Sequence, residues 1–452
     1  MNIVIVGDGK VGYTLASELS REGHDIVIID KNERVLGGAQ DTLDVMTVTG
    51  NGASLEIQKE AGVKDSDLLI AATSSDEVNI LSCVLARRLG CANTIARVRN
   101  PEYESQLSFL RDDLGLSMTV NPEKSAAHEI FSLLQFPTFL NRDTFSRGRI
   151  ELVELMIRPD SILSGVELNK FYDIVKVKVL ICVVDRNGAI TIPSGDFVLM
   201  AGDKITVTAA SSNLAMFIKN LNISNVKVHN VVIIGGSRTA VYLAAELVKS
   251  RVSVKIIEKD PQRCLELSGL LPDVLILEGD GSSVALIESE DIANADAVVT
   301  LTGIDEENLI ISMYAKSLGV PKCIPKINNV EYGNILKNTG VESFVVPKRL
   351  TTEKIVRYVR AMESTSGGQV VSLIRIANGT AEALEFTVSD DFGGNSIPFS
   401  SLDIKDSILI ACILRGASII IPGGSDYLQS GDDVIIVAPT NNAIIDLNDI
   451  LV

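Results

Sequence analysis

Aromatic side chains are scarce in this sequence of 452 residues: they make up 4% of it, and tryptophan is absent. Proteins that bind single-stranded nucleic acids use aromatic stacking platforms and a basic surface. Here 58 acidic residues outnumber 41 basic ones, which gives a formal net charge of −17. We therefore expect no nucleic-acid partner. A few local cations could still hold a single anionic ligand.

Cysteine and histidine are too few and too scattered to predict a metal site. The six cysteines contain no CxxC pair and form no closely spaced group with the three histidines. Structural metal sites need such clusters, and reducing compartments favour free thiols. We expect no metal, and we expect the thiols to be buried and unpaired.

Apolar residues are plentiful, at 46%, but they never form a long run. The longest stretches, such as residues 408–414, fall far short of the ~18–20 residues that span a bilayer. No basic segment precedes the apolar residues 3–6, as an export signal would require. The sequence thus predicts neither a membrane-spanning helix nor an export signal.

The sequence does contain a long internal repeat. Gly235 follows Gly7 by 228 residues, and Glu258 follows Asp30 by the same 228 residues. Further pairs keep an offset of 229 residues: Asp76 and Asp305, Asn79 and Asn308, Arg97 and Lys326, Gly202 and Gly431, Asp203 and Asp432. Chance matches do not hold one offset over so many separated motifs, so two halves of about 225 residues share one plan.

Each half first alternates apolar strands with helical segments and then changes to short strands with turns. The alternation of strands and helices predicts a doubly wound parallel sheet, and the short strands with turns predict a small α+β module. The expected fold class is α/β, a tandem repeat of a Rossmann-like domain followed by a small α+β domain. The expected domains are 1–120 (Rossmann-like), 121–147 (helical crossover), 148–225 (small α+β), 229–346 (Rossmann-like), 347–367 (helical crossover) and 368–452 (small α+β).

The first half opens with a complete dinucleotide-binding fingerprint. Gly7, Gly9 and Gly12 follow an apolar strand and begin a helix, and Asp30 ends the next strand. These glycines permit a tight turn, a close approach of the backbone to a pyrophosphate, and packing of the helix on the sheet. The helix N-terminus favours phosphate. Asp30 would accept the ribose hydroxyls and repel a 2′-phosphate, so NAD or ATP/ADP fits better than NADP.

The second half carries a degraded copy of this fingerprint. Ser237 replaces the middle glycine and Ala240 the last one, while Glu258 keeps the ribose acid. Arg238 stands beside the turn where the first half has Lys10. Both a functional and an empty second site remain open at this stage. If both sites bind nucleotide, we expect the first to be the tighter.

Other polar residues follow the later strands of the first sheet. Asp76, like Asp305 in the second half, precedes a helix, and we expect it to be an N-cap that could also face a ligand. Arg97 and Arg99 lie on one face of a strand and could bind phosphate or a neighbouring carboxylate. Glu123 is most simply a first-turn acid opposing a helix dipole.

Catalytic residues are missing from this pattern. Of the three histidines, only His128 is expected on a helix near the site, and none has a counterpart in the other half. An oxidoreductase needs a proton-relay residue and a substrate domain. A repeated nucleotide site joined to a repeated small module favours a sensor. An NAD-dependent oxidoreductase and a structural scaffold are the alternatives.

The motifs GDGKVG with Asp30, VTGNGAS, AATSSDEVN, IARVRNPEY and PSGDFVLMAGDKITV together resemble the RCK family (regulator of K+ conductance, also called KTN). The likeness covers essentially the whole chain as two TrkA-N/TrkA-C domain pairs. It implies a cytoplasmic homo-oligomeric ring, dimeric or tetrameric, which binds NAD+/NADH or ATP/ADP. The ring would gate a membrane potassium-translocating subunit, and so would be attached peripherally to the inner face of the membrane.

The resemblance also implies which residues contact the nucleotide. In the first half they are Gly7, Asp8, Gly9, Lys10, Val11, Gly12, Asp30, Thr73, Ser74 and Arg97. In the second half they are Gly235, Gly236, Ser237, Arg238, Thr239, Ala240, Glu258, Thr302 and Gly303. Lys348 stands where the first half has Glu123, so any interface or metal role of that acid is not duplicated.

Two apolar helical stretches after the sheets are candidates for subunit contacts. They carry Ile130, Leu133 and Leu134 in the first half, and Ile355, Tyr358 and Val359 in the second. The alternative is that these side chains pack only on their own domain.

Overall fold

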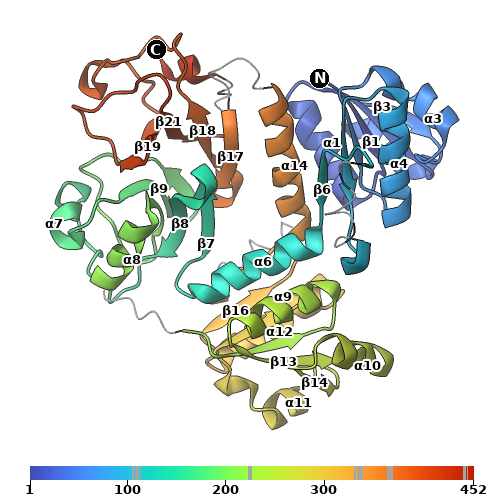
Figure 1. The fold of residues 1–452 in the computed structure, drawn as a ribbon. Coiled ribbons are helices and arrows are strands. Elements are labelled where there is room, and N and C mark those ends of the chain that lie inside the picture. Colours follow the sequence, from blue (N-terminus) through green and yellow to red (C-terminus); the bar gives the residue numbers. More distant parts are fainter. Residues whose placement is uncertain are drawn as a thin grey trace. The chain divides into compact units, whose positions relative to one another are not determined.

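The structure is a computed structural model that describes residues 1–103, 106, 111, 113–221, 227–329, 332, 339–363, 370–440, 444 and 446–452. It divides into two compact units, each built from two separate stretches of the chain (Figure 1). Unit one comprises residues 1–131 and 230–356, and unit two comprises residues 132–229 and 357–452.

The first sheet of unit one is parallel, with the strand order β3-β2-β1-β4-β5-β6 (Figure 1). Its inner strands are continuous runs of buried aliphatic residues, as expected where helices cover both faces. The strands are β1 (Asn2–Val6), β2 (Asp25–Asp30), β3 (Met46–Thr49), β4 (Leu68–Ala71), β5 (Asn93–Arg97) and β6 (Met118–Val120). The helices are α1 (Lys10–Arg21), α2 (Glu33–Thr42), α3 (Leu55–Glu60), α4 (Asp76–Leu89) and α6 (Pro122–Gln135), whose last turn belongs to unit two.

The second sheet of unit one repeats this order as β14-β13-β12-β15-β16 and is also parallel. Its strands are β12 (Asn230–Ile234), β13 (Ser253–Glu258), β14 (Leu275–Glu278), β15 (Ala297–Thr300) and β16 (Lys322–Pro325). Its helices are α9 (Arg238–Lys249), α10 (Pro261–Leu270), α11 (Val284–Ser289), α12 (Asp305–Ser317) and α14 (Pro347–Glu363), which runs on into unit two. In both sheets the strand order reverses beside β1 or β12, at the point where doubly wound folds bind ligands.

Unit two holds two antiparallel sheets with matching orders, β10-β9-β11-β8-β7 and β20-β19-β21-β18-β17. The strands of the first are β7 (Asn141–Phe145), β8 (Ile150–Met156), β9 (Leu180–Arg186), β10 (Ala189–Thr191) and β11 (Lys204–Ala210), with helices α7 (Phe171–Val175) and α8 (Ser211–Asn220). Those of the second are β17 (Val370–Ile376), β18 (Ala381–Thr387), β19 (Leu409–Arg415), β20 (Ser418–Ile420) and β21 (Asp433–Pro439).

The two sheets of unit two share one apolar core. Buried residues of the first sheet, such as Leu152 and Cys182, cluster with Ala383 and Cys412 of the second. Each module on its own is small, so joining them buries apolar area that neither could bury alone. The equivalent sheets of the two halves therefore pack against each other inside this unit.

The expected fold class, a tandem of Rossmann-like and small α+β domains, is confirmed. All six cysteines are free and buried, as expected. Residues 141–145 form strand β7 within the segment that the sequence predicts as a helical crossover. The expected boundaries at 225 and 367 lie outside the described residues. Among the helices that the structure describes, none is long and apolar enough to cross a membrane.

Candidate functional site

The three glycines after β1 have three different structural roles. Gly7 has a φ of +101°, which L side chains rarely adopt, and a Cβ there would lie 3.0 Å from the Thr73 backbone. A Cβ on Gly12 would lie 1.8 Å from the Gly7 carbonyl oxygen, so α1 can approach the turn only without a side chain there. A Cβ on Gly9 would meet nothing within 4 Å. Gly7 and Gly12 thus shape the turn, and Gly9 leaves open space beside it.

Asp30 is held in place by backbone amides at the end of β2. Its Oδ2 accepts from the amide of Asp8 at 2.8 Å, and its Oδ1 accepts from the amide of Asn32 at 2.8 Å. Each oxygen keeps a lone pair for a further donor. Because the carboxylate lines the cavity described below, it is oriented to accept the hydroxyls of a ribose.

Asp8 belongs to the turn, between Gly7 and Gly9, but does not line the cavity. Its carboxyl group is buried, and within the described residues neither of its oxygens has a hydrogen-bond partner. Burial, with a smaller contribution from the Asp30 charge, raises the pKa of Asp8 to about 6. The second half has Gly236 at this position, where a Cβ would lie 2.5 Å from Leu267.

A buried amide joins the loop after β4 to the end of β5. Asn79, on α4, accepts from the Thr73 amide at 2.8 Å and from the Thr73 hydroxyl at 2.7 Å. Its amide group donates to the carbonyl oxygens of Thr73 at 3.2 Å and Arg97 at 2.9 Å. Asn308 makes three corresponding bonds, to the amide and carbonyl of Thr302 and to the carbonyl of Lys326. An equivalent asparagine thus holds the loop and the neighbouring strand end together in both halves.

The prediction that Asp76 and Asp305 are N-caps is wrong. The cap of α4 is Ser75, whose side chain accepts from the amide of Val78. Asp76 begins the helix and accepts from the amides of Arg99 and Asn100 at 2.9 and 2.8 Å. Asp305 likewise accepts from the amides of Asn328 and Asn329. The free amides after the neighbouring strand attract these carboxylates more effectively than the helix's own first turn.

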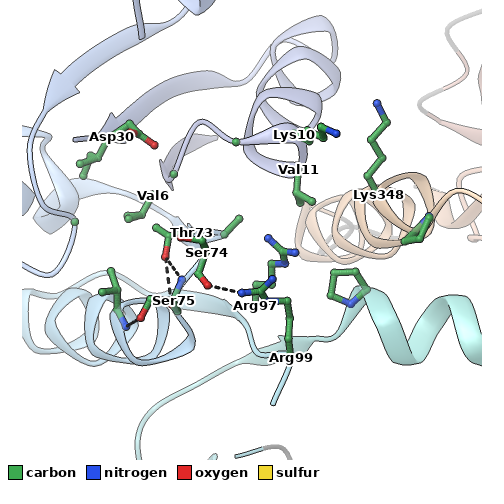
Figure 2. Close-up of a pocket in the computed structure, with 18 of the residues that line it drawn as sticks. Val6, Lys10, Val11, Asp30, Thr73, Ser74, Ser75, Arg97, Arg99 and Lys348 are labelled. Atoms are coloured by element: carbon green, nitrogen blue, oxygen red, sulfur yellow. Dashed lines mark hydrogen bonds between the residues drawn. The ribbon is translucent and has the colours of Figure 1, made fainter. Parts of the chain in front are cut away.

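A cavity of about 550 Å³ opens beside this turn, and it is lined by both halves of unit one. Lys10 on α1, Arg97 on β5 and Lys348 on α14 line the cavity away from Asp30 (Figure 2), with Glu123 among them, and Lys31 lines it next to Asp30. Arg99 and Lys326 also line it. The carboxylate of Asp30 beside the turn, together with an excess of cations over the two acids that line the cavity, matches a ligand with a ribose and phosphates.

The two arginines of β5 and its following loop differ in their partners. Arg99 lies 3.7 Å from Asp76 and donates to the Ser74 carbonyl oxygen, so the carboxylate alternative is confirmed for it. The Nε of Arg97 is buried without a hydrogen-bond partner in the described structure. Burial lowers the pKa of Arg97, and the charge of Glu123 opposes this. Burial also lowers the pKa of Lys326. Buried cations of this kind favour an anionic ligand.

The second half forms a smaller cavity, of about 360 Å³. Glu258 is oriented as Asp30 is: it accepts from the amides of Gly236 at 2.6 Å and Asp260 at 2.9 Å. The hydroxyl of Ser237 caps α9 by accepting from the amide of Ala240 at 3.4 Å, whereas Gly9 makes no such bond to α1. The helix terminus that would face a phosphate is thus already partly satisfied in the second half.

The structure brings together most of the expected site residues. Those that line the first cavity are Gly7, Gly9, Lys10, Val11, Asp30, Thr73, Ser74 and Arg97. Those that line the second are Gly235, Gly236, Ser237, Glu258, Thr302 and Gly303. Asp8, Gly12, Arg238 and Ala240 line neither, and Thr239 lines the first cavity instead of the second.

Sequence reasoning missed the contribution of the second half to the first cavity. Lys326, Asn328, Pro347 and Lys348 all line it. The pairing of Lys326 with Arg97 in the repeat marks this residue as equivalent to a site residue. It does not say which cavity the side chain enters, because spacing along the chain carries no information on how the two halves pack.

Five of the six apolar helical residues proposed as subunit contacts are buried within the single chain, and Tyr358 is half-buried. Ile130, Leu133 and Leu134 are each at most 2% exposed, and Ile355 and Val359 are fully buried. The five buried side chains therefore pack within this chain, which favours the alternative for them.

Models of two protein families match the chain. The TrkA-N domain matches residues 3–122 and 231–347, and the TrkA-C domain matches residues 152–222. A Trk system potassium uptake protein TrkA homolog of Archaeoglobus fulgidus is 33% identical over 97% of both chains. The Trk system potassium uptake protein TrkA of Haemophilus influenzae is 30% identical over 96% of this chain and 95% of its own.

Solved structures share the fold at lower identity. The GsuK RCK domain superimposes with a TM-score of 0.64 at 18% identity, covering 97% of this chain and 92% of that chain. A GsuK channel bound to NAD gives 0.63 at 18%, covering 97% and 77%. A GsuK structure bound to ADP gives 0.52 at 14%, covering 80% and 69%.

Proposed function

The chain belongs to the TrkA family of Trk system potassium uptake proteins, and from this premise we propose that it is a nucleotide-sensing regulatory subunit of a potassium uptake system. It acts on a membrane subunit that conducts the ion. Its place is the cytoplasm, where its partner holds it at the inner face of the membrane. Two or four copies form the gating ring.

One observation carries the nucleotide part of this proposal: the oriented carboxylate of Asp30 and the cations Lys10, Arg97, Lys326 and Lys348 line one cavity beside the glycine turn. Asp30 binds the ribose hydroxyls, the turn around Gly9 and the start of α1 bind the phosphates, and Arg97 neutralises them. The ligand is an adenine nucleotide, NAD+/NADH or ATP/ADP. GsuK, which shares the fold, has been solved with NAD and with ADP.

In the second half, Gly235, Gly236 and Ser237, with Glu258, Thr302 and Gly303, form the corresponding site. Arg238, Thr239 and Ala240 act there only through the position of α9, since they do not line its cavity. This site is the weaker of the two for phosphate-bearing ligands.

The first cavity can couple binding to shape because two sheets of unit one contribute to it. Phosphates held by Lys10 and Arg97 from one half also attract Lys326 and Lys348 from the other. A ligand shifts an equilibrium only by its difference in affinity for the two states, which is typically ~1–3 kcal/mol. Nucleotide occupancy of the first half therefore sets how firmly the two halves are drawn together.

The oxidoreductase alternative is not favoured. The relatives are named as potassium uptake proteins rather than as enzymes. His24 is buried beside the N-terminal amine, and the exposed His128 ring lies 3.6 Å from Glu246. Neither ring lines a cavity that the structure describes, so neither is placed to relay a proton to a ligand.

Calorimetric titration of the full chain with NAD, ADP and ATP tests the proposal. We expect binding that Asp30→Ala weakens by ~1–3 kcal/mol, the cost of losing charge-assisted hydrogen bonds. The chain should not turn over NAD or NADH with simple alcohols, aldehydes or hydroxy acids. Steady turnover, or an affinity that Asp30→Ala leaves unchanged, would count against this function.

A further inference from the structure

The two cavities of unit one carry opposite charge. The first is lined by six cationic side chains and two carboxylates. The second is lined by one cation, Lys259, and three carboxylates, those of Glu258, Asp280 and Glu307. At two equivalent positions the first half has the neutral residues Asn51 and Val78. A phosphate is thus attracted to one cavity and repelled by the other.

The second half directs its own cations to the first cavity. Lys326 is equivalent to Arg97 but lines the first cavity, and Lys348 lies beside it. The charge of Arg238, which stands where the first half has Lys10, acts on Arg97. Among the described residues, no arginine lines the second cavity. The pairing of the halves therefore removes from the second site the counter-ions that a phosphate needs.

The second cavity still has the features that hold a ribose. Both oxygens of Glu258 accept one backbone amide each, which fixes the carboxylate while leaving lone pairs for hydroxyl donors. Gly279, Gly281 and Gly303 also line the cavity, and a Cβ on Gly303 would meet nothing within 4 Å. In contrast, the start of α9 is capped by the hydroxyl of Ser237, so fewer amides remain for an anion.

We propose that the second cavity binds an uncharged nucleoside with a free ribose diol, and that the two halves rank ligands by phosphate charge in opposite order. The first half prefers ATP and ADP to adenosine, and the second half prefers adenosine to ADP and ATP. This inference rests on the proposed function, because it assigns nucleotide phosphates to the first half. One chain can then respond to the phosphorylation state of a nucleotide pool and not only to its concentration.

Titration of the full chain with adenosine, ADP and ATP tests this ranking. Glu258→Gln keeps the length of the side chain and removes its charge. We expect it to weaken one adenosine component at least about tenfold, a free-energy change of about 1.4 kcal/mol. ADP binding at the first half should stay within about twofold, because Glu258 lies in the other cavity and salt screens charges that are far apart. Added salt should weaken ADP binding and leave the Glu258-dependent adenosine component unchanged.

Exchanging residues between the halves gives a second test that does not depend on Glu258. Asp280→Asn with Glu307→Val introduces the first-half residue types, and we expect ADP affinity at the second half to rise at least about tenfold. The reciprocal pair, Asn51→Asp with Val78→Glu, should lower ADP affinity at the first half. All four positions line a cavity, and Val78 and Glu307 also belong to helices. Each exchanged variant must therefore keep the unfolding midpoint of the wild-type chain, which controls for folding.

The proposal is overturned if ADP or ATP binds the Glu258-dependent site as tightly as adenosine does. It is also overturned if no adenosine component responds to Glu258→Gln, or if the exchange leaves the ranking unchanged. Failure of the proposed function looks different: ADP, ATP and NAD would then show no component that responds to Asp30→Ala. The adenosine titration would still report on the second half in that case.

Discussion

At the residue scale, Asp8 lies in an environment unlike that of an ordinary surface aspartate. Its carboxyl is buried beside Asp30, which raises its pKa from 3.8 to about 6. Between these values the folded chain holds a proton that the unfolded chain has lost, so the free energy of unfolding falls as pH rises from about 4 to 6. Above that range the full penalty of burying the charge is present.

Asp8→Asn should remove this penalty. We expect the free energy of unfolding to rise by up to about 3 kcal/mol at pH 8, and by roughly half of that at pH 5. Urea unfolding at the two pH values measures the difference. The exposed Asp25→Asn variant is the control and should leave the pH dependence as it is. An equal gain for Asp8→Asn at both pH values would contradict a raised pKa at Asp8.

Gly9 can be tested separately from folding, because a Cβ there meets nothing within 4 Å. Gly9→Ser should leave the unfolding midpoint unchanged and weaken ADP and NAD binding at the first half at least about tenfold, since the side chain enters the space left for phosphate. Gly37→Ser, which also meets nothing, is the matched control. Retained affinity in Gly9→Ser would show that the phosphates bind elsewhere.

The glycine turn is also where the sequence was most informative. Residue type and spacing predict the turn, the helix and the acid, because each requirement acts within a few residues of the chain. The bond from Asp76 to the amides of Arg99 and Asn100 was missed, since it joins residues 23 and 24 positions apart. A local pattern that suits an N-cap gives no sign of this more distant partner.

At the scale of elements, Asn79 connects α4 to the loop after β4 and to the end of β5. Asn79→Asp would replace two donated bonds by a carboxylate facing the carbonyl oxygens of Thr73 and Arg97. We expect nucleotide affinity at the first half to fall at least about tenfold, because the loop and Arg97 lose their common support.

A control for Asn79 must separate positioning from stability. Ser82 lies on the same helix, is fully buried and donates to the carbonyl of Val78. Ser82→Ala should change the unfolding midpoint but not the affinity, measured by titration with ADP. If both variants lower affinity in proportion to their loss of stability, Asn79 has only a structural role.

At the scale of the whole molecule, the important consequence of the repeat is that equivalent domains of the two halves lie in the same unit. The sequence predicts two similar halves in order along the chain. The structure instead groups the two parallel sheets in one unit and the two antiparallel sheets in the other. Periodicity and motif spacing show which face of a helix or strand is apolar. They carry no information on which of the two halves packs against that face. The lysines that the second half adds to the first cavity were missed for this reason.

Lys348 tests this pairing directly. Lys348→Gln should weaken ATP binding at the first half by about three- to tenfold at low salt. We expect this loss although Lys348 lies 225 positions beyond Glu123 in the sequence, and still farther beyond the glycine turn. The loss should shrink as salt is added. Lys249→Gln, an exposed lysine at the end of α9, is the control. An unchanged ATP affinity in Lys348→Gln, alongside a loss in Lys10→Gln, would show that the first half binds alone.

The most direct measurement is potassium flux through the membrane subunit, reconstituted in vesicles with this chain, while ADP, ATP or NAD is titrated. The account predicts that flux changes over the concentration range in which the nucleotide binds. It also predicts that Asp30→Ala moves the midpoint of that change at least about tenfold. Flux that ignores nucleotide, or an Asp30→Ala variant that loses binding while its flux response stays in place, would contradict it.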